Sequence, residues 1–127
     1  METGVGSYGL CGVKLVEATL VSRLLLEQPK RLPDLRLFKR SISVVQIEDR
    51  RIAHGIKGQC DLWGTWRGGR HVELEAKQKR GRLSPEQETW RDWCLAWGVP
   101  WLQLKPIKGE TEEQTIDRWI IEIRLTR

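Results

Sequence analysis

Two carboxylates, Asp61 and Glu75, lie in adjacent segments that the sequence predicts to be paired strands. These segments, residues 59–66 and 70–77, flank a glycine-rich turn that is typical of a β-hairpin. A three-residue loop makes the pairing symmetric about Gly68 and places the two carboxylates opposite each other, with Cβ atoms about 5 Å apart. Opposed carboxylates repel unless a shared proton, a lysine or a cation neutralises them. Because Mg²⁺ prefers such oxygen ligands, the pair is a candidate metal site.

Alternation of residue types divides this predicted hairpin into an acidic and an apolar face. The acidic face carries Asp61, Trp63, Glu73, Glu75 and Lys77. The other face, which must pack on the core, carries Leu62, Trp66, Val72, Leu74 and Ala76. Two alternatives stay open at this point. A two-residue Gly68-Gly69 turn would shift the register by one residue and remove the opposition, and the acidic face would be a solvated surface in the simpler interpretation.

Two further polar residues are predicted on helices that flank the hairpin in the sequence. Residues 13–28 have apolar residues at helical spacing, and Glu17 falls within that stripe. A carboxylate there is costly unless it is paired or bound to a metal; the alternative is a position at the edge of the stripe, with the carboxylate in solvent. Gln87 opens the apolar stripe of a helix that begins after Ser84, where the alternative is a capping role alone.

A run of basic residues follows the predicted acidic strand directly. It includes Lys79, Arg80 and Arg82, and such runs bind phosphate backbones. The alternative is a solvated charge run. The net charge of +5 favours an acidic partner, with nucleic acid first and a membrane surface second.

The remaining chain predicts alternating helices and strands. The first helix is expected to end before Pro29, and residues 29–36 are expected to form a loop, because a residue that precedes proline avoids helical geometry. Further strands are predicted at 41–47, around Ile52 and at 101–104, and further helices from Ser84 to Gly98 and over 111–125, the last with a strand over Trp119–Leu125 as its alternative. Without the short segment at Ile52, the order is helix, three strands, helix, strand, helix. This is a mixed α/β single domain with residues 1–12 as a flexible lead-in.

The composition excludes several classes of protein. With 127 residues, 39% hydrophobic and 31% charged, the chain is expected to form one soluble globular domain. It contains no apolar run long enough to span a membrane and no signal-peptide pattern, so we expect an intracellular protein. The three cysteines, Cys11, Cys60 and Cys94, are odd in number and widely spaced, so we expect them to be reduced and mostly buried.

The acidic and basic residues together resemble a known signature. Asp61, then Glu75-Ala76-Lys77, then Gln87 resemble the pattern of the PD-(D/E)xK nuclease superfamily. More narrowly, residues 55–64, 71–77 and 81–87 resemble the VRR-NUC family, the virus-type replication-repair nucleases. Glu17 matches the acid on that family's first helix, whereas Cys60 replaces the proline that the superfamily name expects. Only Glu75 has a lysine two residues on, which distinguishes it from Glu73.

This resemblance covers about residues 13–105 and implies a fold and a chemistry. The fold would be a restriction-endonuclease-like core in the order αβββαβ, with a mixed central sheet and a C-terminal helix, over a nuclease domain at 13–127. The activity would be metal-dependent hydrolysis of a DNA phosphodiester, with Mg²⁺ or Mn²⁺ as the cofactor. Asp61, Glu75 and the Ala76 carbonyl would hold the metal, and Glu17 would complete the site directly or through a bound water.

The resemblance also implies roles for the remaining residues and a substrate. Lys77 would orient the attacking water or stabilise charge on the phosphate, and Gln87 would position Lys77 or the phosphate. The basic run, Lys79, Arg80 and Arg82, would hold the DNA backbone without reading its sequence.

Stand-alone members of the family look like homodimeric, structure-specific endonucleases of phages and bacteria that cut branched DNA such as Holliday junctions. DNA repair in the cytoplasm of a bacterium or of a phage-infected cell is the implied setting, with no membrane partner. Two alternatives remain. One is a non-catalytic nucleic-acid-binding module on the same fold, and the other is a small basic protein that recruits repair proteins.

Overall fold

The hairpin has the register that a three-residue loop predicts. The computed structural model describes residues 17–40, 43–47, 50–54, 56–77 and 81–127. Strand β4 (Leu62–Trp66) pairs antiparallel with β5 (His71–Ala76), and Leu62 lies opposite Leu74. The Trp66 N–H donates to the Arg70 carbonyl at 2.8 Å, which closes the turn around Gly68, at φ 101°. The two-residue alternative is therefore wrong.

A four-stranded sheet is built around this hairpin. Strand β1 (Leu35–Lys39) adds antiparallel to β4, and β6 (Trp101–Leu104) adds parallel to β5, which gives the order β1-β4-β5-β6. The parallel pair needs a crossover connection, which helix α2 (Pro85–Ala96) supplies. The predicted mixed α/β class with a mixed sheet is confirmed.

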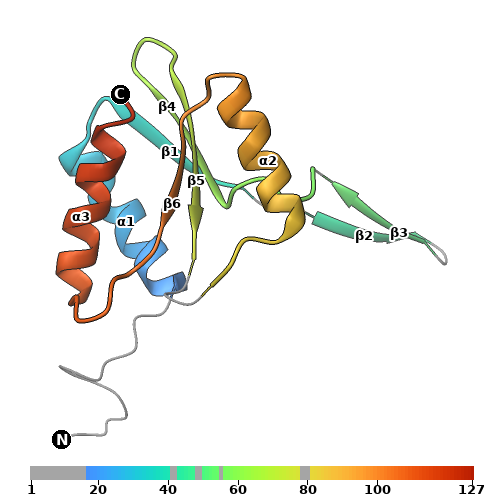
Figure 1. Ribbon diagram of the computed structural model, residues 1–127, viewed down its shortest axis with the longest axis horizontal. Coiled ribbons are helices and arrows are strands. Elements are labelled where there is room, and N and C mark those ends of the chain that lie inside the picture. The colour runs from blue at the N-terminus through green and yellow to red at the C-terminus, as the bar shows by residue number, and fades with distance from the viewer. Residues whose placement is uncertain (1–16, 41–42, 48–49, 55, 78–80) are drawn as a thin grey trace, which may run out of the picture.

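Two helices cover one face of the sheet and a third lies on the other face (Figure 1). Helices α1 (Glu17–Arg31) and α3 (Glu112–Arg124) pack together and on the apolar face of the hairpin. The core between them includes Leu24 of α1, Leu74 of β5 and Trp119 of α3, all of them fully buried. The prediction that this hairpin face packs on the core is confirmed.

Strand β1 is the element that the sequence did not predict, because residues 29–36 were expected to form a loop. It is an edge strand, and only Leu35 in it is fully buried, so its hydrophobic alternation is weak. The strand predicted at 41–47 does form, as β2 (Ser43–Ile47), and Ile52 lies in β3 (Arg50–His54). These two strands form a separate two-stranded sheet, which projects from the body (Figure 1). The first strand of the main sheet is therefore β1.

Helix α1 continues past Pro29, so the expected end at Gln28 is wrong. The Leu32 N–H donates to the Gln28 carbonyl at 2.8 Å, which completes a last turn beyond the proline. The buried Gln28 amide also donates to the Leu32 and Leu35 carbonyls, at 2.8 and 2.6 Å. These bonds join the end of the helix to the start of β1. The stability they add offsets the loss of the helical hydrogen bond that Pro29, which has no N–H, cannot donate.

The predicted caps of the other two helices are confirmed. Ser84 and Gln87 form a capping box at α2, Thr111 is the N-cap of α3, and Gly98 follows α2 with a positive φ of 75°. A strand over Trp119–Leu125 is wrong, because these residues belong almost entirely to α3.

Several sequence predictions lie outside the described residues. These are the lead-in at 1–12, the first turn of the predicted first helix, and Cys11. Cys60 and Cys94 are free and buried, as predicted. Among the described residues, no helix is long and apolar enough to cross a bilayer.

Candidate functional site

Asp61 and Glu75 lie together at one end of the hairpin. Asp61 directly precedes β4, and extension of the Leu62–Leu74 register places it opposite Glu75. The Asp61 carbonyl accepts from the Arg40 N–H at 2.7 Å, which continues the β1–β4 pairing and fixes the backbone of Asp61. Asp61 is half-buried and Glu75 is 2% exposed. The alternative in which this face of the hairpin is solvated is therefore wrong at Glu75.

Burial and a neighbouring charge raise the pKa of the Glu75 carboxyl. Desolvation is the largest cause, and the Asp61 charge and a hydrogen bond with Asp61 act in the same direction, so that the pKa of Glu75 rises to about 8. The Lys77 ammonium, whose Nζ lies 3.9 Å from Glu75 Oε2, lowers the pKa of Glu75 but does not compensate. Without a bound metal ion, the Glu75 carboxyl therefore holds a proton at neutral pH.

The two oxygens of Glu75 differ in their surroundings. Oε2 accepts a hydrogen bond from the Gln87 side-chain amide at 3.2 Å. Oε1 is buried, and of the side-chain polar atoms that the structure describes as buried it alone has no hydrogen-bond partner. An ionised oxygen buried without a donor is costly, because it has lost its hydration. A bound cation would satisfy it.

Glu73, two residues earlier on the same face, is neutralised within the protein. Arg40 binds both of its oxygens, at 2.7 and 3.0 Å, and His71 and Trp90 add bonds at 2.5 and 3.0 Å. Burial raises the pKa of Glu73, but the bonds from Arg40, His71 and Trp90 outweigh burial and leave that pKa below its usual value. Glu73 therefore has no oxygen to offer a ligand, and the choice of Glu75 over Glu73 agrees with the structure.

Gln87 has the capping role that the sequence offered, and its side-chain amide donates to Glu75, whereas the resemblance implied that it positions Lys77 or the phosphate. Its Oε1 accepts from the Ser84 N–H at 2.9 Å, which closes the capping box, and its Nε2 donates to Glu75. The first turn of α2 is thereby attached to the site. Gly58 allows this arrangement, because a Cβ there would lie 2.3 Å from the Glu86 carbonyl oxygen. Its φ of +94° is also one that side-chain-bearing residues rarely adopt.

Glu17 reaches the same site from α1. It is half-buried, and its pKa is raised first by desolvation and then by the negative charge of Asp61, whereas the positive charge of Lys77 lowers it. Glu17, Asp61, Glu75 and Lys77 therefore influence one another electrostatically. The acid on the first helix is part of this cluster and not a distant surface group.

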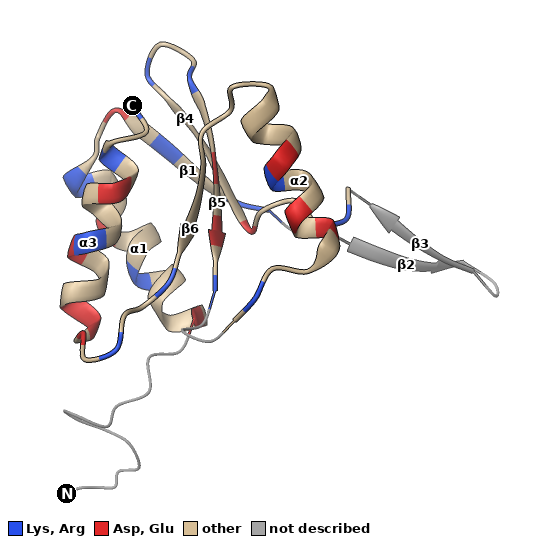
Figure 2. Cartoon of the chain, viewed as in Figure 1, with Lys and Arg blue, Asp and Glu red and all other residues tan. Residues whose placement is uncertain are grey.

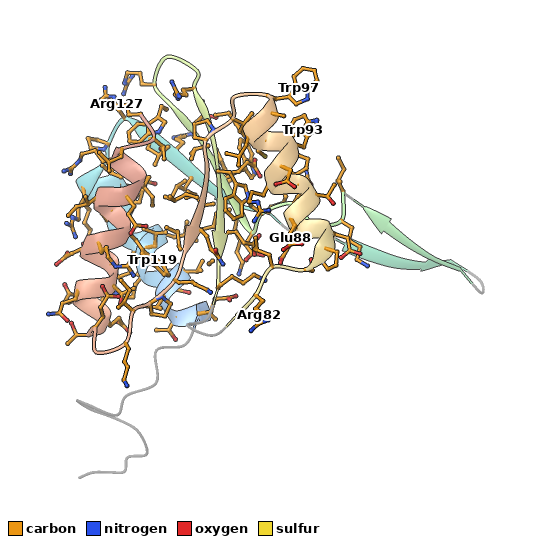
Figure 3. The ribbon with its side chains drawn as sticks, in the orientation of Figure 1. Arg82, Glu88, Trp93, Trp97, Trp119 and Arg127 are labelled. Carbon is orange, nitrogen blue, oxygen red and sulfur yellow. The ribbon has the colours of Figure 1, made fainter. Side chains whose placement is uncertain are left out.

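The predicted basic run is described only in part. Arg82 is exposed on the segment that leads from β5 to α2 (Figure 3), and Lys79 and Arg80 lie outside the described residues. Lys77, at the start of this segment, has a side chain that is 18% exposed and directed toward Glu75.

The donor set fits a small, hard divalent cation. Two carboxylates from Asp61 and Glu75 converge, and Ala76 follows Glu75 at the end of β5 with a backbone carbonyl of the same donor type. In the described part of the chain, no three His, Cys, Asp or Glu side chains converge closely enough to hold a metal. Mg²⁺ is commonly held by one or two carboxylates and several waters, so Glu17 fits contact through a bound water better than direct contact.

Four residues with structural roles at the site were missed from the sequence. Arg40 neutralises Glu73, His71 and Trp90 form hydrogen bonds with it, and Gly58 admits the first turn of α2. Only Gly58 left a signal, because it lies three residues before Asp61 in a glycine-containing turn. The Arg40 partnership spans 33 residues and depends on the pairing of β1, which no local pattern predicts.

Comparisons with known proteins do not place this chain in a family. No family model matches it, and neither a curated protein nor a solved structure matches it.

Proposed function

We propose that this protein is a divalent-metal-dependent endonuclease that hydrolyses DNA phosphodiester bonds. The observation that carries the proposal is the environment of the Glu75 carboxyl. It is buried beside a second carboxylate, it has one unpartnered oxygen, and a lysine lies 3.9 Å from the other. A structural glutamate would be neutralised within the protein, as Glu73 is, so the arrangement at Glu75 favours a ligand.

The order of the elements supports a restriction-endonuclease-like core. In chain order, α1, β1, β4, β5, α2 and β6 give helix, three strands, helix, strand, with β2 and β3 inserted after the first strand and α3 at the end. This is the αβββαβ order of the PD-(D/E)xK superfamily that the sequence resembles. Asp61 directly precedes β4, and the Glu75-Ala76-Lys77 segment lies at the end of β5, so both lie on the second and third strands of that order or next to them.

Each residue of the site would have a separate role in hydrolysis. A metal held by Asp61, Glu75 and the Ala76 carbonyl would supply an acidified water and positive charge for the phosphate. Lys77 places an ammonium beside Glu75, where it can orient the attacking water or stabilise developing charge. Gln87 holds Glu75 Oε2 and so directs the carboxylate, and Glu17 adds negative charge near Asp61.

The substrate and the assembly follow from the resemblance to the VRR-NUC family. Branched DNA, such as a Holliday junction, is the proposed substrate, and a homodimer is the proposed assembly, because two symmetric cuts require two sites. The net charge of +5 supports an anionic partner. Lys79, Arg80 and Arg82 are proposed to hold the DNA backbone.

One assay tests the proposal directly. The purified protein is mixed with plasmid DNA and with a four-way junction, in Mg²⁺ or Mn²⁺ and in chelator, beside the Glu75→Gln variant. We expect cleavage that requires metal and is absent from the variant. Cleavage that survives chelator, or that is equal in the variant, would exclude this site as its source.

A non-catalytic nucleic-acid-binding module is the second candidate. It is favoured by the net charge of +5, which suits an anionic partner whether or not the chain cleaves that partner. That candidate predicts metal-independent DNA binding and no cleavage of any substrate in the same assay.

A further inference from the structure

Three aromatic side chains form a row across the sheet, on the same face as Asp61 and Glu75. Phe38 of β1 stacks on Trp63 of β4, with ring centroids 4.6 Å apart, and Trp63 stacks on His71 of β5 at 5.7 Å. The interplanar angles are 25° and 24°, so the three rings stand nearly parallel. We call Phe38, Trp63 and His71 the aromatic row.

The strand register places this row beside the carboxylate pair. Phe38 lies opposite Trp63, and Trp63 follows Asp61 by two residues on the same face of the hairpin. Two residues along a strand span about 7 Å. A nucleic acid strand that reaches Asp61 and Glu75 with a phosphate therefore has neighbouring nucleotides within reach of the row.

The outer end of the row is open to solvent. Phe38 is 41% exposed and lies on β1, the edge strand of the sheet. Helix α2, which lies on this face, packs against β6 at the opposite edge (Figure 1). One ring face of Phe38 is used by Trp63, so a further flat ring would extend the stack on the other.

The charges around the row suit an anionic ligand. Arg36 lies two residues before Phe38 on the same face of β1, and Arg70 precedes His71 in the turn; both are exposed. Neither takes part in an ion pair among the residues that the structure describes. Basic residues along β1 and at the β4–β5 turn are visible in Figure 2. The acid next to the row, Glu73, is already neutralised by Arg40.

We infer that the aromatic row stacks an unpaired nucleobase of the DNA substrate, with Arg36 at the adjacent phosphate. The inference rests on the proposed nuclease function and narrows its substrate. A base within a duplex cannot offer its face to Phe38, because both of its faces are stacked on neighbouring pairs. The favoured substrate therefore has a single-stranded or unpaired nucleotide close to the cut, as branched DNA with a single-stranded arm does and a fully paired four-way junction does not.

Binding measured in chelator tests the inference without any cleavage. Binding would be measured by fluorescence anisotropy, with wild-type protein or Phe38→Ile titrated into labelled DNA. The two DNA ligands are an oligothymidylate and a blunt duplex of equal length. Isoleucine suits an edge strand but has no aromatic face. We expect Phe38→Ile to weaken oligothymidylate binding by about five- to a hundred-fold, the range for loss of one stacked base, and to leave duplex binding nearly unchanged.

Two further variants serve as controls for this result. Phe38→Trp keeps a ring and should bind the oligothymidylate at least as tightly as wild type. Trp97→Leu removes an exposed aromatic at the C-cap of α2, 72% exposed and outside the row, and should change neither affinity (Figure 3). Should Phe38→Ile fail to fold, the uncharged Phe38→Thr supplies the ring deletion, with circular dichroism to verify its fold.

Four binding results would overturn the inference. They are no loss of affinity in the ring-deletion variant, an equal loss on duplex and single strand, an equal loss in Trp97→Leu, and no detectable DNA binding. Conversion of a dimer to a monomer by Phe38→Ile in light scattering would also overturn it, because the row would then be a contact between copies of the chain. Because none of these readouts needs metal, a failed cleavage assay leaves this test intact.

Discussion

Glu73 and Glu75 are two residues apart on one face of β5 and equally buried, but only Glu73 has protein partners for both of its oxygens. Glu73 is 1% exposed and Glu75 is 2% exposed. Arg40 binds Glu73 with two hydrogen bonds, whereas Glu75 Oε1 has no partner among the described residues. The same residue type in the same strand therefore serves stability at one position and is available for a ligand at the other.

Substitution of each glutamate by glutamine should give opposite results. Glu73→Gln leaves the Arg40 guanidinium without its counter-charge, so we expect a loss of about 3–5 kcal/mol in the free energy of unfolding. Glu75→Gln removes a carboxyl whose charge is unfavourable there, so we expect unchanged or higher stability together with loss of Mn²⁺ binding. Urea denaturation and calorimetric Mn²⁺ titration measure the two quantities. Equal effects of the two variants on Mn²⁺ binding would contradict the assignment.

The raised pKa of Glu75 predicts how stability depends on pH in chelator. The folded chain holds this proton up to about pH 8, whereas the unfolded chain releases it near its ordinary pKa of 4.5. The resulting stabilisation is complete below the ordinary pKa and is lost as the pH rises through about 8. We expect the free energy of unfolding of wild type, relative to Glu75→Gln, to decline over that range. A flat difference, measured by denaturation at several pH values, would show that Glu75 is ionised throughout.

Lys77→Ala should abolish cleavage without an equal loss of DNA binding. An ammonium that acts on the water or on the phosphate in the transition state contributes to the rate more than to affinity. We expect a fall of about two to three orders of magnitude in the single-turnover rate on a four-way junction at saturating enzyme. Arg82→Ala is the control, with weaker affinity and a persistent rate. A near-normal rate for Lys77→Ala would remove this residue from the reaction.

Gly58→Ala should disturb the site through α2. The added Cβ would lie 2.3 Å from the Glu86 carbonyl oxygen, so the first turn of α2 must move and carry Gln87 away from Glu75. Gly109→Ala is a matched control, because φ there is +88° but nothing lies within 4 Å of the new Cβ. Both variants should lose about 1–2 kcal/mol of stability from backbone strain. Only Gly58→Ala should also weaken Mn²⁺ binding, and equal Mn²⁺ affinity in the two variants would argue against this role.

The basic run should set the salt dependence of DNA binding. If each of Lys79, Arg80 and Arg82 neutralises one phosphate, replacement of one by alanine should reduce the log–log salt slope by about one unit. Duplex binding at several salt concentrations measures the slope. An unchanged slope in the triple alanine variant would assign the run to a solvated surface.

Most of the correct predictions from the sequence depend on interactions between residues that are close together in the chain. The glycine turn predicted the hairpin but left two loop lengths open, and the three-residue loop that forms is the one that places Asp61 opposite Glu75, because the loop length determines which residues face each other. The Ser84 and Thr111 caps set the starts of α2 and α3, because their partners lie only three residues away. The acidic face, the apolar face and the second helix therefore followed from short segments.

The features that the sequence did not predict depend on contacts between residues that are far apart in the chain. β1 has a weak pattern and exists because β4 lies beside it, and residues 41–47 form a strand outside the main sheet. The continuation of α1 past Pro29 depends on a buried amide that reaches the start of β1. The neutralisation of Glu73 depends on Arg40, 33 residues away in the sequence. Only the folded chain brings these partners together.

Helix α2 buries a single residue, Cys94, whereas α3 buries five. Its remaining attachments include the bonds from Gln87 to Glu75 and from Trp90 to Glu73, and the close approach of Gly58. Elements with little buried apolar surface open locally at a lower free energy than the core that supports them. Partial opening of α2 would therefore break the hydrogen bond to Glu75 while the α1–α3 layer stays folded, and a ligand held jointly by Asp61 and Glu75 would favour the closed state of α2.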